Sequence, residues 1–302
     1  MAKRLLAWGF VAVVFSPALM AAAALTPTEI ISAAKPNEWR ALDPARTLVL
    51  SLETGDVVIE LAPRFAPKHV ANVRQLVSQG YFDGLTVNRV QDNFVAQWGD
   101  PSAKREIGQA SKTLAPEFTT GLLKAFQALP DADHFAAEVG FVDGFAAARD
   151  LNAKQTWLTH CYATVGVGRD NAADSGGGTE LYAVIGHAPR QLDRNITVLG
   201  RVVLGMELLS SLSRSLEPGG FFSDPQQGAK ILRIRAGTKA LQLEALRTDS
   251  LSFQALIEAR RNRRDEWYLR PAGYVDICNV PLPVREKEAS VRRVMGVERV
   301  TK

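Results

Sequence analysis

Apolar and polar residues alternate over most of the stretch between residues 47 and 237, as they do in strands that bury one face. The segment TLVLSLETGDVVIELAP alternates on both sides of the turn cluster Thr54-Gly55-Asp56, which predicts a β-hairpin. Two more strands are expected around Asp92-Asn93. The same pattern returns in CYATVGVG (161–168), ELYAVIG (180–186), NITVLGRVV (195–203) and KILRIRAG (230–237).

Two segments between these strands have helical spacing instead. Residues 65–79 end at Gly80 and carry apolar residues on one face, namely Val70, Val73, Leu76 and Val77. Residues 206–216 (MELLSSLSRSL) predict a second helix with Leu208, Leu209, Leu212 and Leu216 on one face. About eight strands with hairpin-length links and no βαβ alternation favour a mainly β fold. We expect a closed eight-stranded antiparallel barrel capped by two helices.

The barrel pattern is interrupted once and flanked on both sides. Residues 25–46 predict a short helix from Pro27 or Thr28 and then an irregular arm. Residues 119–157 form an insertion, in which LLKAFQAL (122–129) is compatible with a helix. We therefore place the barrel domain at residues 47–237. Residues 238–302 follow as a small α/β extension, with a helix that carries Phe253, Leu256 and Ile257 and a strand over 274–285.

Residues 1–24 have the composition of a signal peptide. Lys3 and Arg4 precede an apolar run, and Ala21 to Ala24 offer small residues to a signal peptidase. An uncleaved anchor helix is the alternative, because the apolar stretch approaches the ~20 residues that span a bilayer. Pro17 and the alanine run favour cleavage. We expect an exported protein, periplasmic or secreted, with no stable membrane span in the mature form.

Charge and cysteine content exclude several classes of function. The formal charge is +4, and Lys3 and Arg4 contribute two of these charges, so nothing argues for a nucleic-acid partner. The two cysteines, Cys161 and Cys278, could form a disulfide in an oxidising compartment or remain two buried thiols. No second pair at ligand spacing accompanies His160-Cys161, so we expect no metal and no cofactor.

The sequence supports neither a nucleotide-binding loop nor a catalytic triad. The glycine-rich GVGRDNAADSGGG precedes a strand and not a helix, so it is a hairpin loop and not a nucleotide-binding loop. No G-x-S-x-G elbow occurs, and the four histidines neighbour no nucleophile by sequence signature. Arg89 remains, in VNRVQDNFVAQWGDP (87–101). Taken alone, it is compatible with a surface arginine on an edge strand.

Four motifs in order change that interpretation of Arg89. The stretch ETGDVVIELAPRFAPKHVANVRQLVSQGYFDGLTVNRVQDNFVAQWGDP contains T-x-G-x-V-x-I-x-L, A-P-x-x-V-x-N, G-Y-F-D-G and R-V-x-x-N-F-x-x-Q-x-G-D-P. Weaker matches follow in YATVGVG, GTELY, VLGRVVLGME and KILRIRAG. The sequence resembles the cyclophilin-type peptidyl-prolyl isomerases over roughly residues 47–237. The arm, the insertion and the extension lie outside the resemblance.

The resemblance implies a flattened barrel with its active site on an outer face and Arg89 as the catalytic arginine. Gln97 takes the position of a glutamine that holds the substrate backbone. The proline pocket falls at Phe94, Val95, Tyr182 and Leu192. Other positions depart from the family: Glu180 replaces a second glutamine, Ile196 the pocket histidine, Gln191 the tryptophan and Gly166 the backbone-binding asparagine. If Glu180 pairs with Arg89, it could either orient the guanidinium or compete for it.

The implied chemistry needs neither a nucleophile nor a cofactor. Rotation of an X–Pro bond breaks amide resonance over a barrier of roughly 18–20 kcal/mol, and the twisted prolyl nitrogen recovers its lone pair. A fixed guanidinium can donate a hydrogen bond to that nitrogen only in the twisted state, which lowers the barrier. We expect a monomeric isomerase acting on unfolded or folding proline-containing polypeptides. The alternatives are a proline-peptide-binding chaperone with little turnover and a structural envelope protein.

Overall fold

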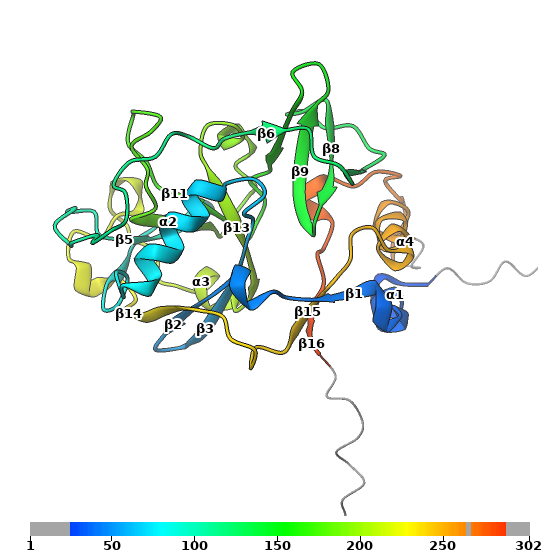
Figure 1. Ribbon diagram of the computed structural model, residues 1–302. Helices are drawn as coiled ribbons and strands as arrows, with labels where there is room; N and C mark the ends of the chain where they lie inside the picture. The colour runs from blue at the N-terminus through cyan, green and yellow to red at the C-terminus, as the bar shows by residue number, and fades with distance from the viewer. Residues whose placement is uncertain (1–24, 264–266, 288–302) are drawn as a thin grey trace, which may run out of the picture.

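Eight strands form one antiparallel sheet whose order is β14-β2-β3-β13-β11-β12-β5-β4. Figure 1 shows where β2, β3, β5, β11, β13 and β14 of this sheet lie. The computed structural model describes residues 25–263 and 267–287, so the signal peptide predicted for residues 1–24 lies outside the described residues. The strands of this sheet are β2 (Thr47–Leu52), β3 (Gly55–Leu61), β4 (Thr86–Val90), β5 (Val95–Gly99), β11 (Thr164–Val167), β12 (Glu180–Val184), β13 (Val198–Leu204) and β14 (Ile231–Ala236).

Backbone hydrogen bonds near the two edge strands nearly close the sheet into a barrel. The Gly84 amide donates to the carbonyl of Ile231 at 2.9 Å, and the Ile231 amide donates to Leu85 at 2.8 Å. The Val87 amide donates to Ala229 at 2.8 Å. Because these bonds pair the exposed edges, they remove the unpaired backbone groups of an open sheet. The predicted mainly β, eight-stranded antiparallel barrel is confirmed.

Two helices pack against the barrel interior. Helix α2 (Pro67–Ser78) buries the predicted apolar face in the same core as the strands, and Gly80 follows it with φ of +69°. Helix α3 (Met206–Ser210) is shorter than the predicted helix over 206–216, and Leu216 is fully exposed. The reason is a C-terminal cap, because Nη1 of Arg214 donates to the carbonyls of both Ser210 and Leu212 at 2.6 Å.

The insertion folds into a five-stranded sheet of its own, with the order β6-β10-β9-β8-β7. The helix considered for residues 122–129 is absent. Ala125 has φ of +62°, which breaks a helix, and the Leu129 amide instead pairs with the carbonyl of Val139 at 2.8 Å. The strands are β6 (Thr120–Gly121), β7 (Gln127–Ala128), β8 (Glu138–Val142), β9 (Phe145–Asp150) and β10 (Gln155–Leu158).

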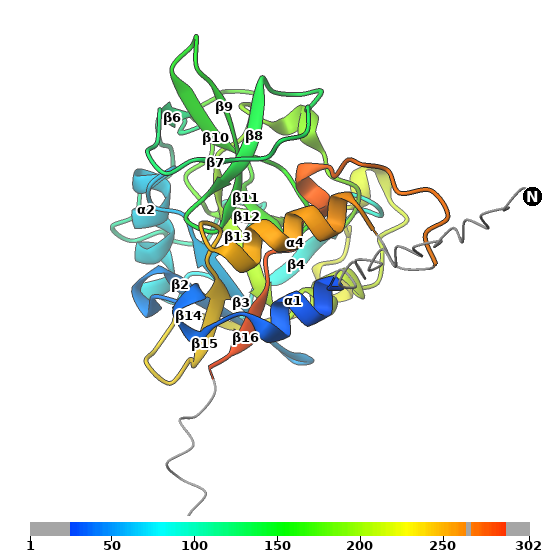
Figure 2. The ribbon, with the colours of Figure 1, turned by 90° about the vertical axis from the view of Figure 1, so that its right-hand side faces the viewer.

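The arm and the C-terminal extension pair with each other. Strand β15 (Leu243–Leu246) lies between β1 (Trp39–Ala41) and β16 (Val284–Glu286) in a third sheet. Helix α1 (Pro27–Ala33) lies beside α4 (Leu251–Arg261), as Figure 2 shows. Among the described residues, no helix is long and apolar enough to cross a bilayer.

The prediction of a strand over residues 274–285 is mostly wrong, because only Val284 and Arg285 of this range belong to a strand. The Asp276 carboxylate accepts a hydrogen bond from the Cys278 amide at 2.8 Å and starts a 3₁₀ turn, η6 (Ile277–Asn279). Pro281 and Pro283 have no N–H to donate to a ladder, so pairing begins only at β16. The other 3₁₀ turns are η1 (Pro36–Glu38), η2 (Pro44–Arg46), η3 (Arg190–Leu192), η4 (Pro218–Gly220) and η5 (Pro225–Gln227).

Arm, insertion and extension share a hydrophobic core that is separate from the barrel core; we call it the side core. In it, the Phe141 ring of the insertion meets the Phe253 ring of α4 edge to face, with centroids 4.9 Å apart. Its buried members are Ile30, Ala34, Trp39, Leu129, Val139, Phe141, Ala148, Trp157, Cys161, Leu246, Phe253, Leu256, Val275, Ile277 and Val280.

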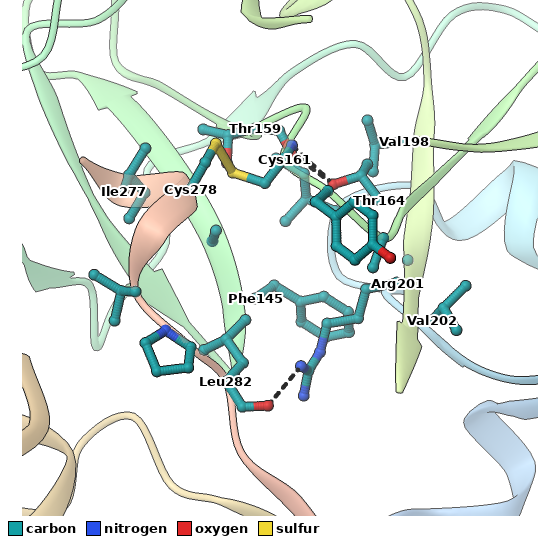
Figure 3. A pocket seen from close by; sticks show the side chains of 17 residues that line it. Phe145, Thr159, Cys161, Thr164, Val198, Arg201, Val202, Ile277, Cys278 and Leu282 are labelled. Atoms are coloured by element: carbon teal, nitrogen blue, oxygen red, sulfur yellow. Dashed lines mark hydrogen bonds between the residues drawn. A yellow bond between two sulfur atoms is a disulfide. The ribbon is translucent and has the colours of Figure 1, made fainter. Parts of the chain in front are cut away.

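A disulfide joins Cys161 to Cys278, which are 117 residues apart in sequence, and ties the extension to the barrel (Figure 3). Reducing it should lower the free energy of unfolding by about 2–4 kcal/mol, because the unfolded chain regains the entropy of a long loop. Urea unfolding with and without reductant measures this difference. A double variant, Cys161→Ser with Cys278→Ser, is the control and should not respond to reductant. Equal midpoints for the oxidised and reduced protein would contradict the prediction.

Candidate active site

Pairing of β4 with β5 positions the arginine and the first glutamine. Arg89 lies opposite Gln97 in the antiparallel register, after an irregularity in the ladder between Thr86 and Arg89. The chain turns between the strands at Asn93, which has φ of +53°. Residues that face each other across an antiparallel pair place their side chains on the same face of the sheet. The two polar groups therefore sit side by side on the outside of the barrel.

Three neutral oxygen atoms hold the half-buried Arg89 guanidinium. Nε donates to the carbonyl of Gly219 at 2.6 Å, Nη2 to Oε1 of Gln91 at 2.5 Å, and Nη1 to Oε1 of Gln97 at 3.2 Å. Burial lowers the pKa of Arg89 and nearby Glu180 opposes the shift, but a guanidinium stays charged at any physiological pH. The site thus holds a fixed positive charge.

Glu180 reaches Arg89 only through Gln97. Nε2 of Gln97 donates to Oε2 of Glu180, which leaves Oε1 of Gln97 to face the guanidinium. Burial raises the pKa of the Glu180 carboxyl, although the hydrogen bond from Gln97 opposes the shift. Of the two roles considered for Glu180, this arrangement matches an orienting role, exerted on the amide and not directly on the guanidinium.

A cavity of about 400 Å³ opens beside Arg89, and all eight site residues expected from the sequence line it. Val95 and Tyr182 are buried and pack with Val184, and the half-buried Phe94 and Ile196 lie against them. Ile196 therefore contributes an apolar surface where the family has a histidine. The residues brought together are Arg89, Phe94, Val95, Gln97, Glu180, Tyr182, Leu192 and Ile196.

Phe221 is a cavity residue that the sequence did not indicate. Its ring lies 4.8 Å from the Arg89 guanidinium carbon, and the Phe94 ring lies 5.4 Å from the same carbon. A bridge between Phe221 and Arg89 brings the loop after α3 against β4. This approach needs glycine at Gly220, because a Cβ there would come within 2.6 Å of Gln91. The Gly-Gly-Phe-Phe sequence was the only available signal.

Gly166, which the resemblance places at a backbone-binding position, does not line the cavity. Gly166 pairs with Tyr182 in β11–β12, and a Cβ on it would come within 2.3 Å of the Tyr182 hydroxyl, so it stands behind the cavity wall. Gly168 and Arg169 line the cavity instead. Gln191 is exposed and does not line it.

The insertion stays out of the cavity: none of the cavity's lining residues belongs to residues 119–157. A second cavity of about 230 Å³ lies between the barrel, the insertion and the extension, next to the disulfide (Figure 3). There Arg201 donates to the Leu282 carbonyl at 3.4 Å and pairs with Glu60 at 3.3 Å. Within the described part of the chain, no cluster of three or more His, Cys, Asp or Glu side chains is arranged to hold a metal ion.

Comparisons with known proteins agree with this geometry. The family model described as cyclophilin type peptidyl-prolyl cis-trans isomerase/CLD matches residues 47–236. A protein of Brucella suis biovar 1 named "Probable peptidyl-prolyl cis-trans isomerase" is 30% identical over 200 residues, which cover 66% of this chain and 87% of that protein. A protein of the same name from Brucella abortus gives the same identity and coverage.

A solved structure extends the likeness beyond the matched region. The crystal structure of cyclophilin AquaCyp293 from Hirschia baltica aligns with a TM-score of 0.64 and 25% identity, covering 87% of this chain and 99% of that one. The family match covers more than half of the chain and spans the nearly closed barrel. The chain therefore belongs to the cyclophilin-type peptidyl-prolyl cis-trans isomerases, the enzymes that rotate X–Pro bonds.

Proposed function

We propose that Arg89 is the catalytic group of this isomerase and that its substrates are X–Pro bonds in exported, folding polypeptides. The observation that carries the catalytic assignment is the held guanidinium at the wall of the apolar cavity. A guanidinium has five N–H donors, and the three hydrogen bonds to Gly219, Gln91 and Gln97 occupy three of them. One N–H on each of Nη1 and Nη2 is left for a substrate.

These remaining donors act on the twisted amide. In the planar ground state the prolyl nitrogen lone pair is delocalised and accepts no hydrogen bond, whereas in the twisted state it does. Donation from Arg89 therefore stabilises the transition state more than the substrate, which is the condition for a faster reaction. Because the guanidinium is already held in place, little reorganisation opposes this step.

The apolar residues fix the ring whose nitrogen reacts. Phe94, Val95 and Ile196 offer an apolar surface to a pyrrolidine ring, and the Phe94 ring lies 5.4 Å from the guanidinium carbon of Arg89. A lower local dielectric strengthens the hydrogen bond from the guanidinium. Gln97, held between Arg89 and Glu180, stands at the edge where the substrate backbone would pass.

A binding protein without turnover is the second candidate, and the site does not favour it. Binding a proline ring requires the apolar cavity but no fixed cation. The three hydrogen bonds on Arg89 orient a group whose distinct use is in the twisted state. The family membership points the same way.

Replacing Arg89 by alanine should lower kcat/KM for a proline tetrapeptide by about a hundredfold or more, because the donor to the prolyl nitrogen is lost. A protease-coupled isomerisation assay measures the rate. Arg233→Ala is the matched control, since Arg233 is an exposed arginine on β14. A rate for Arg89→Ala close to that of wild type would remove Arg89 from the mechanism.

Glu180→Gln should change how stability depends on pH. Burial raises the folded-state pKa of Glu180 above its ordinary value of 4.5. Wild type therefore has the full stability contribution of this carboxyl below pH 4.5 and loses it as the pH rises through the higher folded pKa. Glutamine does not titrate, so the stability of the variant relative to wild type should increase across that window.

Urea unfolding of both proteins at several pH values from 4 upward measures that gap. Glu53→Gln, in the exposed turn between β2 and β3, is the control for a neutralised surface carboxylate. A constant gap between Glu180→Gln and wild type would show that Glu180 has no raised pKa.

The proposal of an exported substrate pool draws on two features, the composition of residues 1–24 and the Cys161–Cys278 pair. Disulfides persist in oxidising compartments outside the cytoplasm. Fused to an alkaline phosphatase that is active only after export, residues 1–24 should produce activity, and the mature protein should begin shortly after Ala24 by mass spectrometry. A fusion with Lys3 and Arg4 changed to glutamate should be exported less. An inactive wild-type fusion would refute the location.

A further inference from the structure

A line of five buried or nearly buried polar side chains runs from the insertion to the wall of the prolyl cavity. Its members come from the insertion, the segment after β10, strand β12 and the turn η3, and each contacts the next through a hydrogen bond. We call it the Asp133–Tyr182 chain; in order, its members are Asp133, Arg190, Asp193, His160 and Tyr182.

At the insertion end, both carboxylate oxygens of Asp133 accept hydrogen bonds from Arg190. Nη1 and Nη2 of Arg190 donate to Oδ1 and Oδ2 of Asp133 at 2.8 and 3.0 Å, and each side chain is only 4% exposed. The Phe135 ring covers the guanidinium at 5.1 Å. A bidentate pair of this kind fixes both the position and the plane of the guanidinium.

In the middle, Asp193 links Arg190 to His160. Nε of Arg190 donates to Oδ2 of Asp193 at 2.7 Å, while Oδ1 of Asp193 accepts from the His160 amide at 2.9 Å and lies 3.0 Å from Nδ1 of His160. Burial acts to raise the pKa of Asp193, but the hydrogen bond from His160 and the charge of Arg190 lower it overall. Arg190 therefore lies between two carboxylates that share its donors.

At the cavity end, the Asp133–Tyr182 chain contacts two residues that line the cavity, Tyr182 and Leu192. Nε2 of the fully buried His160 lies 2.9 Å from the Tyr182 hydroxyl, and the two rings are nearly parallel. Leu192 lies in the 3₁₀ turn η3 between Arg190 and Asp193, and Tyr182 and Leu192 both line the cavity. A shift of Arg190 would therefore move one wall directly and release the other through His160.

We propose that Asp133 is a positioning residue: through Arg190 it sets the placement of Leu192 and Tyr182 and hence the affinity of the cavity for proline. The proposal rests on the isomerase function. Removing one carboxylate of a buried pair leaves the guanidinium partly unpaired, so the turn that carries Leu192 relaxes. Arg89 has a separate set of partners, Gly219, Gln91 and Gln97, so its orientation is preserved.

The test compares two neighbouring aspartates. Asp133→Asn should weaken binding of a proline tetrapeptide about three- to tenfold while the interconversion rate at saturation changes less than twofold. NMR titration and exchange spectroscopy measure both quantities on one sample. Asp131→Asn is the control, because Asp131 makes an equivalent bidentate pair with Arg261 of α4 at 2.7 and 2.9 Å. It should lower the unfolding midpoint without weakening peptide binding.

A second variant keeps the proposal testable if Asp133→Asn does not fold. Tyr182→Phe keeps the ring and removes only the hydroxyl that contacts His160, so it should also weaken peptide binding. The double variant should bind no more weakly than the weaker single variant, because both changes break the same chain. Wild-type affinity in a folded Asp133→Asn, or in Tyr182→Phe where Asp133→Asn does not fold, would overturn the proposal, as would fully additive losses.

Equal weakening by Asp131→Asn and Asp133→Asn would also overturn it, since that result would show a general structural effect. Peptide affinity and turnover are separate readouts. Absent turnover in wild type would count against the isomerase function, whereas the affinities test only the positioning role.

Discussion

The site depends on a cation that no carboxylate neutralises directly. Among the described residues, the hydrogen bonds of Arg89 all end on neutral oxygens, and Glu180 is kept one side chain away by Gln97. A carboxylate paired directly with the guanidinium would neutralise its positive charge and would occupy the N–H donors needed at the prolyl nitrogen. Carbonyl and amide oxygens occupy three of the five N–H groups of Arg89 without that loss and leave two for the substrate, at the cost of partial desolvation.

The sheet order separates the reacting side of the barrel from its supporting side. Arg89, Gln97, Glu180 and Tyr182 come from β4, β5 and β12 at one end of the order. The Leu282 carbonyl of the extension and the insertion residue Phe145 meet Arg201 of β13, further along the same sheet. The additional segments therefore enlarge the molecule without covering the cavity. The insertion contacts the cavity residues only from behind, through the buried hydrogen bonds of the Asp133–Tyr182 chain.

The barrel could be predicted from the sequence because apolar residues recur at every second position in strands such as β2, where Leu48, Leu50 and Leu52 all enter the barrel core. The eight cavity residues followed from the resemblance to the cyclophilin-type isomerases, because the matching motifs allow the family's site positions to be carried over to this sequence. Phe221 could not be found this way, because a long loop carries it to β4 and only the folded chain shows where it lands. The sheet of the insertion was also missed, since its strands bury small residues such as Ala147 and Ala148 on both faces and lose the alternation.

The Asp133–Tyr182 chain lay beyond sequence reasoning for a related reason. His160 and Asp193 are 33 residues apart, and Asp133 and Arg190 are 57 residues apart, so no local pattern links them. Each residue taken alone is a common polar residue. Only burial makes their pairing obligatory, because a buried charged group without a partner is costly.

The position of Cys278 also has a consequence for the order of events during synthesis. Every strand of the barrel, through β14, precedes this cysteine in the chain. Until Cys278 has been synthesised, Cys161 has no other cysteine of this chain with which to pair. We expect the barrel to fold first without the disulfide, which forms only after the C-terminal extension has docked against the barrel.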